Sequence, residues 1–260
     1  RWRGEKLVNT YIYSERKLRM KIIISPSKTK KINNLKEIEE FKKPLFLKTT
    51  NKIIKEISQF SLDEMEKKFK LKKEQGEKLL KFYKNFKKEN FGHALMSYSG
   101  IAYKAINIES FDKQDIEFAE EHLVILSALY GILTPKTELK EYRLDMVNGI
   151  FKNKSLYEIW KKEINEYFAK EEVIVNLASK EYSKIIDSPG IYDFEFYTEE
   201  GGKLRQISTN SKKMRGFTLN YIIKNKITDV SELKNITLNG YKYSNKLSSE
   251  KKYLYIKNNC

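Results

Sequence analysis

The segment EVIVNLAS, residues 172–179, has its apolar side chains in succession rather than in alternation. Such a run is typical of a strand that is buried on both faces in the middle of a sheet. KIIIS at residues 21–25 is a second β-branched run, and Pro26 ends it as expected for a buried strand that leads into a loop. These two strands predict an α/β core.

Apolar residues elsewhere recur with the period of amphipathic helices. Ser61 and Glu64 have the spacing of a capping box, and Ser110 or Asp112 is a suitable N-cap for a helix that ends near His122. Helices are predicted over residues 51–60, 72–88, about 112–122, 155–170 and about 210–226.

Further strands are predicted from short apolar runs and turn signals. HALMSYS at 93–99 has the composition of a buried strand. LVILSALYGILTP at 123–135 is compatible with a strand followed by a tight helical turn, stopped by Pro135. Alternation on both sides of Gly201-Gly202 predicts a β-hairpin. Two short strands, in GYKY and KKYLYIK, are expected to close the sheet.

Length and continuity favour one domain. A chain of 260 residues is near the upper limit for a single hydrophobic core. It contains no internal repeat and no low-complexity linker. The predicted fold class is α/β (mixed α+β): a single compact domain over residues 20–260, with a mixed sheet flanked by helices. Residues 1–19 lack the apolar core and cleavage site of a secretory signal, and are expected to be a leader or upstream extension outside this core.

The scarce residue types exclude several classes of site. Cys260 is the one cysteine, so there is no intramolecular disulfide and no Cys-rich metal site, and the cytoplasm is the expected compartment. His93 and His122 are too few for a zinc cluster and are expected to be structural. We therefore predict no metal and no cofactor. No apolar run approaches the ~18 residues of a membrane helix, so no membrane partner is expected. A monomer is expected, with the oligomeric state left open.

The net charge is +16, and it is unevenly distributed. Residues 20–90 carry twenty basic and ten acidic side chains, residues 91–180 eleven and fourteen, and residues 181–260 fourteen and nine. Two basic ends around a slightly acidic middle would line a cleft if the ends meet in space, and a polyanion is the natural partner for such a surface. The alternative is a coding bias that places lysine on any tolerant surface.

Arginine is rare in this chain. Of seven arginines, only Arg143, Arg205 and Arg215 follow Met20. A guanidinium holds a carboxylate or phosphate by two parallel hydrogen bonds, which an ammonium cannot do. We therefore expect these arginines to have specific roles. The alternative for Arg143 is a structural ion pair with a neighbouring carboxylate such as Asp145.

Two loops that follow apolar segments could bind phosphate. ISPSKT at 24–29 releases Ser25, Ser27, Lys28 and Thr29 into a Pro-bent loop, where hydroxyls, an ammonium and free N–H groups can bind an anion. In residues 126–146, Gly131 between apolar turns is similar to the hairpin of a helix-hairpin-helix element, which grips phosphates by backbone N–H groups. Tyr142 and Arg143 would then offer a stacking face and a phosphate fork, whereas the alternative is a core aromatic beside a structural arginine.

Two later segments add polar side chains. NLASKEYSK at 176–184 begins at a strand end, where α/β sheets usually bind ligands, although Ser179 also suits a helix N-cap. NSKKMRGF at 210–217 places three cations in the first turns of a helix, which is unfavourable for the helix dipole unless an anion lies nearby. The candidate anion-binding residues in these two segments are Asn176, Ser179, Glu181, Tyr182, Lys184, Lys212, Lys213 and Arg215.

In their order along the chain these strings resemble the peroxide stress protein YaaA family. The resemblance rests on ISPSKT, the segment from Ser99-Gly100 to Tyr103, LSALYGIL followed by YRLDM, NLASKEY with Lys184, and KKMRGF. It covers nearly all of the chain from Met20 to about Lys257. The chain departs from the family pattern at Thr134-Pro135 and Thr137, where the family usually has Arg-Pro and then Asp, and at Ser183, where it has an aromatic residue.

The resemblance implies a family-specific α/β fold with a basic cleft. It also implies binding of duplex or distorted DNA through its phosphates, by a helix-hairpin-helix-like element and with little base specificity, and a role in limiting iron-driven damage without catalysis. An alternative from the residues themselves is an enzyme acting on a nucleotide or other phosphorylated small molecule, with Lys28 or Tyr182 as general base. A third alternative is a scaffold whose charge reflects coding bias alone.

Overall fold

A computed structural model describes residues 19–36 and 38–258. All but Arg19 of the predicted leader, residues 1–19, lies outside the described residues. Of the helices that the model describes, none has the length and apolar character needed to cross a membrane.

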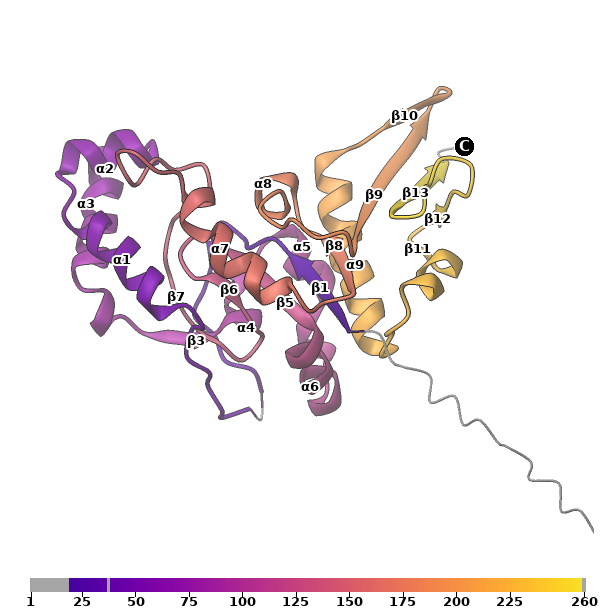
Figure 1. Ribbon diagram of the computed structural model, residues 1–260, viewed down its shortest axis with the longest axis horizontal. Coiled ribbons are helices and arrows are strands. Elements are labelled where there is room, and N and C mark those ends of the chain that lie inside the picture. Colours follow the sequence, from indigo (N-terminus) through magenta and orange to yellow (C-terminus); the bar gives the residue numbers. More distant parts are fainter. Residues whose placement is uncertain (1–18, 37, 259–260) are drawn as a thin grey trace, which may run out of the picture.

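A mixed sheet runs through the molecule (Figure 1). Its strands are β1 (Met20–Ile24), β5 (Leu123–Ser127), β6 (Gly131–Leu133), β8 (Val173–Leu177), β9 (Ile191–Glu200), β10 (Lys203–Arg205), β11 (Thr237–Leu238), β12 (Tyr241–Tyr243) and β13 (Lys252–Asn258). They follow the order β11-β12-β13-β9-β8-β1-β5-β6, with β10 paired to β9 outside that path. The pairings from β13 to β5 are parallel, and the others are antiparallel. The predicted mixed sheet is therefore confirmed.

Helices surround this sheet, and two small sheets pair β2 (Thr29–Lys30) with β4 (Tyr98–Ser99) and β3 (Phe91–His93) with β7 (Glu138–Lys140). The α-helices are α1 (Leu47–Ser58), α2 (Leu62–Phe69), α3 (Lys73–Lys84), α4 (Ala94–Ser97), α5 (Ile101–Ile106), α6 (Lys113–His122), α7 (Leu156–Phe168), α8 (Lys180–Ser183) and α9 (Ser208–Lys224). Figure 1 shows α1, α2 and α3 grouped at one end of the molecule, with β11, β12 and β13 at the other.

Local sequence rules account for many element boundaries. Capping boxes at Ser61, Asp112 and Ser155 start α2, α6 and α7, because each side chain accepts a hydrogen bond from the backbone three residues later. The strands predicted around Gly201-Gly202 pair as β9 and β10. The two tail strands also form, as β12 and β13.

Two predictions of local structure are wrong. HALMSYS does not form one strand: it holds the end of β3, one helical turn in α4, and β4. In residues 123–133 the expected strand forms as β5, but the helical turn expected after it is a turn into the antiparallel strand β6, so the segment is not a helical hairpin. Gly131, at φ +74°, lies where a Cβ would be 2.8 Å from the buried Trp160 ring, so the glycine serves the β-turn and its packing.

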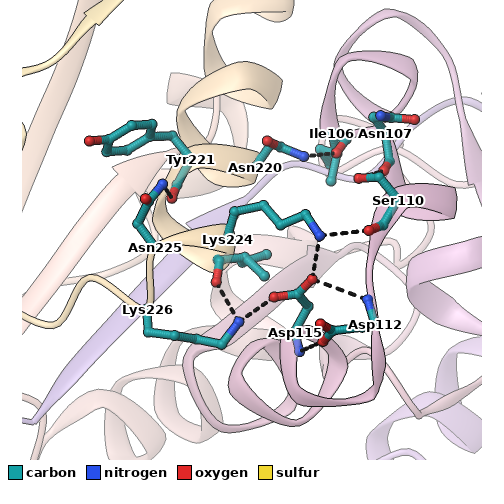
Figure 2. Close-up of polar contacts among 11 residues, drawn as sticks. Ile106, Asn107, Ser110, Asp112, Asp115, Asn220, Tyr221, Lys224, Asn225 and Lys226 are labelled. Atoms are coloured by element: carbon teal, nitrogen blue, oxygen red, sulfur yellow. Dashed lines mark hydrogen bonds and ion pairs between the residues drawn. The ribbon is translucent and has the colours of Figure 1, made fainter.

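Two contacts hold α9 in place, and both involve elements distant in sequence. Gly216 lies so close to α5 that an added Cβ would be 2.2 Å from the carbonyl oxygen of Ala102. At the C-terminal end of α9, the Lys224 amine lies 2.6 Å from the buried Asp115 carboxylate, and Lys226, just beyond the helix, binds the second oxygen of that carboxylate (Figure 2). These contacts fix the helix that carries Lys212 and Arg215.

Replacing Asp115 by Asn should lower the free energy of unfolding by about 2 kcal/mol at neutral pH, because two ammonium groups lose a buried counter-charge. Burial raises the pKa of Asp115, but the hydrogen bonds from Lys224 and Lys226 outweigh it and hold the pKa below its ordinary value. This carboxylate therefore stabilises the fold above the unfolded-state pKa, and its contribution is lost as the pH falls through the folded-state pKa. Urea unfolding of the wild type and of Asp115→Asn at several pH values should show that their free energies of unfolding converge as the pH falls.

Asp63→Asn is the matched control. Asp63 forms an exposed ion pair with Lys67, so its loss should leave stability unchanged within error. An Asp115→Asn protein that is as stable as the wild type at neutral pH would show that the ion pairs of Asp115 with Lys224 and Lys226 do not contribute to stability.

Candidate functional site

A cavity of about 690 Å³ opens at the carboxyl ends of β1 and β8, and is called the strand-end cavity below. Because β1 and β8 are adjacent and parallel, the residues that follow them meet. The Ser25 hydroxyl accepts a 2.8 Å hydrogen bond from the Ser179 backbone N–H and lies 3.1 Å from the Ser179 hydroxyl. This edge of a parallel sheet is where α/β folds most often bind ligands.

Most of the residues selected from the sequence line this cavity. The structure brings together Ser25, Ser27, Lys28, Thr29, Tyr142, Arg143, Ser179, Glu181, Tyr182, Lys212 and Arg215. They come from four segments, after β1, after β7, after β8 and within α9. These four segments, which are far apart in sequence, therefore meet at one cavity.

Three selected residues lie outside the cavity lining. The Asn176 side chain is used within the sheet, where its amide donates to Asp193 at 2.6 Å and its oxygen accepts from the Ala178 N–H at 2.9 Å. The Lys184 amine lies 4.0 Å from the centre of the Tyr157 ring. Lys213 is exposed on α9 and does not line the cavity, although Lys212 beside it does.

Cations outnumber carboxylates in the lining. Lys28, Lys30, Arg143, Lys212 and Arg215 line the cavity, together with Asp145 and Glu181. Asp145 pairs with Lys28 at 3.1 Å. It does not pair with Arg143, which is exposed and makes no ion pair within the described residues, so the structural alternative for this arginine is wrong.

Two charged groups in the lining are buried without full hydrogen bonding. The Nε of Arg215 and one carboxylate oxygen of Glu181 have no partner among the described residues. Burial lowers the pKa of Arg215, opposed by Glu195, and burial raises the pKa of Glu181. Buried polar atoms normally find a partner, so these two atoms are free to bind a ligand.

Hydrogen-bonded tyrosines form the inner wall. The Tyr142 hydroxyl lies 2.9 Å from that of Tyr98 and 2.8 Å from that of Ser127, and Tyr103 donates to the Ser25 carbonyl at 3.1 Å. Tyr142 is 3% exposed, so it is a core aromatic rather than a free stacking face. Burial also raises the pKa of Tyr182 well above its ordinary value, which argues against Tyr182 as the general base.

Lys30 is the main residue that the sequence did not identify. It is 9% exposed, and burial lowers its pKa to about 8. In the sequence it is one of several lysines after ISPSKT, and only the short pairing of β2 with β4 turns it inward. Strand alternation over two residues is too brief a pattern to have identified it.

A second cavity, of about 820 Å³, adjoins the first and is called the α3 cavity below. The two share Lys28, Lys30, Tyr142 and Arg143 in their linings. The α3 cavity adds two cations, two carboxylates (Glu89 and Glu141) and an apolar wall from α3 and its neighbours. These additions include Lys31, Lys78, Leu79 and Phe82.

Comparison with known proteins identifies close similarity along the whole described domain. The model of the family described as peroxide stress protein YaaA matches residues 20–247. UPF0246 proteins of Fusobacterium nucleatum and Clostridioides difficile are each 38% identical, over 248 and 257 residues, and each alignment covers 92% of this chain and 100% of the relative. A UPF0246 protein of Finegoldia magna is 38% identical over 245 residues, with 92% and 98% covered.

The close packing of α9 against α5 holds the helix that carries Lys212 and Arg215, and a substitution at Gly216 tests this contact. Gly216→Ala should lower the free energy of unfolding by about 1–3 kcal/mol, because the new methyl group would meet backbone and force the helices apart. Gly149→Ala is the control, since a Cβ there has no atom within 4 Å. Denaturant midpoints measure both. Equal stability of the two variants would mean that α9 is not held by this contact.

Proposed function

Because the chain belongs to the peroxide stress protein YaaA family, we propose that it binds DNA in the peroxide stress response. In this proposal duplex or distorted DNA is held by its phosphates along the strand-end and α3 cavities, with little reading of bases. The family resemblance extends the proposal to limiting iron-driven damage to the bound DNA.

The observation that carries the proposal is the convergence of cations from separate segments on one lining. Lys28 and Lys30 follow β1, Arg143 follows β7, and Lys212 and Arg215 lie on α9. Phosphate neutralisation supplies most of the affinity in binding that does not depend on sequence. A row of such cations across two joined cavities suits a backbone of regularly spaced charges.

The arginines have distinct roles in this proposal. Arg143 is exposed and lines both cavities, so its guanidinium is placed to bind a phosphate where they join. Arg215 is more deeply placed and has an Nε without a partner, so it would bind an oxygen that enters the strand-end cavity. Each fork can hold two phosphate oxygens, whereas Lys28 and Lys212 act as point charges.

In this proposal the 123–133 segment would not supply the phosphate contacts. Ala128, Leu129 and Tyr130 are buried in the turn between β5 and β6, and the Ala128 carbonyl accepts from the Trp160 indole at 2.8 Å. DNA would therefore be contacted by side chains around the cavities rather than by the N–H groups of a helical hairpin.

A second candidate function is action on a phosphorylated small molecule. The favouring observation is the position and size of the strand-end cavity, which at about 690 Å³ falls within the range of metabolite sites. Ligand and DNA would compete for the same cations. Thermal-shift screening with nucleotides, beside the DNA assay below, distinguishes the two candidates.

If about six phosphates are neutralised, log affinity for DNA should fall against log salt with a slope of roughly −5. Arg143→Gln should weaken binding and reduce that slope by about 1. Filter binding over a salt series measures both, with straight duplex, bulged duplex and single strand as substrates.

Two variants serve as controls for that assay. Lys203→Gln removes an exposed cation on β10, away from both cavity linings, and should leave affinity nearly unchanged. Arg143→Lys keeps the charge and removes the fork, so its affinity should lie between wild type and Arg143→Gln. Absence of salt-sensitive affinity for every DNA would reject the proposal.

A further inference from the structure

Lys30 lies where the two cavities join. It is on β2, opposite Tyr98 of β4, and it lines both the strand-end cavity and the α3 cavity. The residue is only 9% exposed, so protein covers most of it. Its side chain nevertheless borders the space that a ligand would enter.

Among the residues that the structure describes, no carboxylate pairs with the Lys30 amine. Lys30 Nζ lies 4.3 Å from the centre of the Tyr142 ring and 5.5 Å from that of Tyr98. The one hydrogen bond it makes within the described residues, to the Lys28 carbonyl, has a length of 3.5 Å. An ammonium buried against aromatic faces with so weak a hydrogen bond is poorly compensated for the loss of water.

A comparison within the chain shows what a structural buried lysine looks like. Lys136 is 5% exposed, and its amine lies 2.8 Å from Glu117 and 3.2 Å from Glu40. Burial lowers the pKa of Lys136, but those two hydrogen bonds outweigh it and the pKa is raised. Lys30 is similarly buried, but no carboxylate of the described residues forms an ion pair with it.

The surroundings of Lys30 favour its neutral amine more than water does. Burial lowers its pKa to about 8, Asp145 and Glu141 oppose this, and Arg143 adds to it. The titratable groups that face it from the adjoining elements are Tyr98, Tyr142, Glu141, Arg143 and Asp145. A lysine desolvated in this way is a nucleophile at neutral pH.

We propose that Lys30 is a nucleophilic amine that forms an imine with an aldehyde carrying a phosphate group. The cations that share its cavity, Arg143 and Arg215 among them, would hold the phosphate while the carbonyl approaches the amine. The neutral amine adds to the carbonyl carbon, giving a carbinolamine. Loss of water then leaves a C=N bond, and water reverses the step.

This inference goes beyond the proposed function and does not require it. The aldehyde can come from two sources with the same chemistry: a free phosphorylated metabolite, or the open sugar of an abasic site, which has a phosphate on each side. Failure of DNA binding would leave the first source in place, so the two proposals can fail separately.

The test is reductive trapping of the full chain. Pyridoxal 5′-phosphate serves as the small probe, pyridoxal as the matched probe without phosphate, and a duplex with one abasic site as the nucleic-acid probe. Cyanoborohydride delivers hydride to the imine carbon and leaves a stable secondary amine. At limiting probe, peptide mass spectrometry should locate the adduct at Lys30 ahead of the exposed Lys203. The ratio of Lys30 to Lys203 labelling should be at least tenfold higher with pyridoxal 5′-phosphate than with pyridoxal, which cancels the lower intrinsic reactivity of pyridoxal.

Trapping by either phosphate-bearing probe supports the proposal, and the probe that works identifies the source. The rate of labelling at Lys30 should rise as the pH increases through about 8, where its amine loses its proton. Lys30→Arg keeps the cation and should abolish the adduct, with thermal unfolding used to verify the fold. Labelling of Lys30 no faster than Lys203 in the wild type, with both phosphate-bearing probes, would overturn the proposal even if the variant fails to fold.

Discussion

Parallel pairing of β1 with β8 is the constraint on which the site depends. The register aligns Ile24 with Leu177, so the two chains leave the sheet side by side. The hydroxyl of Ser25 then accepts a hydrogen bond from the backbone N–H of Ser179. This bond joins the loops that follow the two strands, which are far apart in sequence. Because these contacts use backbone and short side chains, the longer cationic side chains are left to line the opening.

The wall opposite α9 depends on a chain of hydroxyl groups. Ser127 at the end of β5 contacts Tyr142, and Tyr142 contacts Tyr98 of β4. The loop that carries Arg143 is thus tied to the sheet by the residue just before it. This arrangement explains how Arg143, exposed and with no ion pair in the described part of the chain, can sit on a well-anchored backbone. It also positions the aromatic faces against which Lys30 lies.

Sequence patterns predicted the elements whose signals are local. The Ser61–Glu64 capping box, the Gly201-Gly202 hairpin and the buried strands at 20–24 and 173–177 all form as expected. The 123–133 segment was misassigned because an apolar run around a glycine fits a helical turn and a strand pair equally well, and only packing of Gly131 against Trp160 decides between them. Lys30 and Asn176 were misjudged for a related reason: their partners, Tyr142 and Asp193, lie far away in sequence.

The two attachments of α9 limit how this protein can change in length. Gly216 and Lys224 are eight residues apart, a rise of about 12 Å along an α-helix. Inserting one residue between them would rotate one attachment by about 100° relative to the other, so α5 and α6 could no longer both be engaged. Substitutions on the outer surface of this helix are compatible with the fold, whereas insertions and deletions between the two attachments are not.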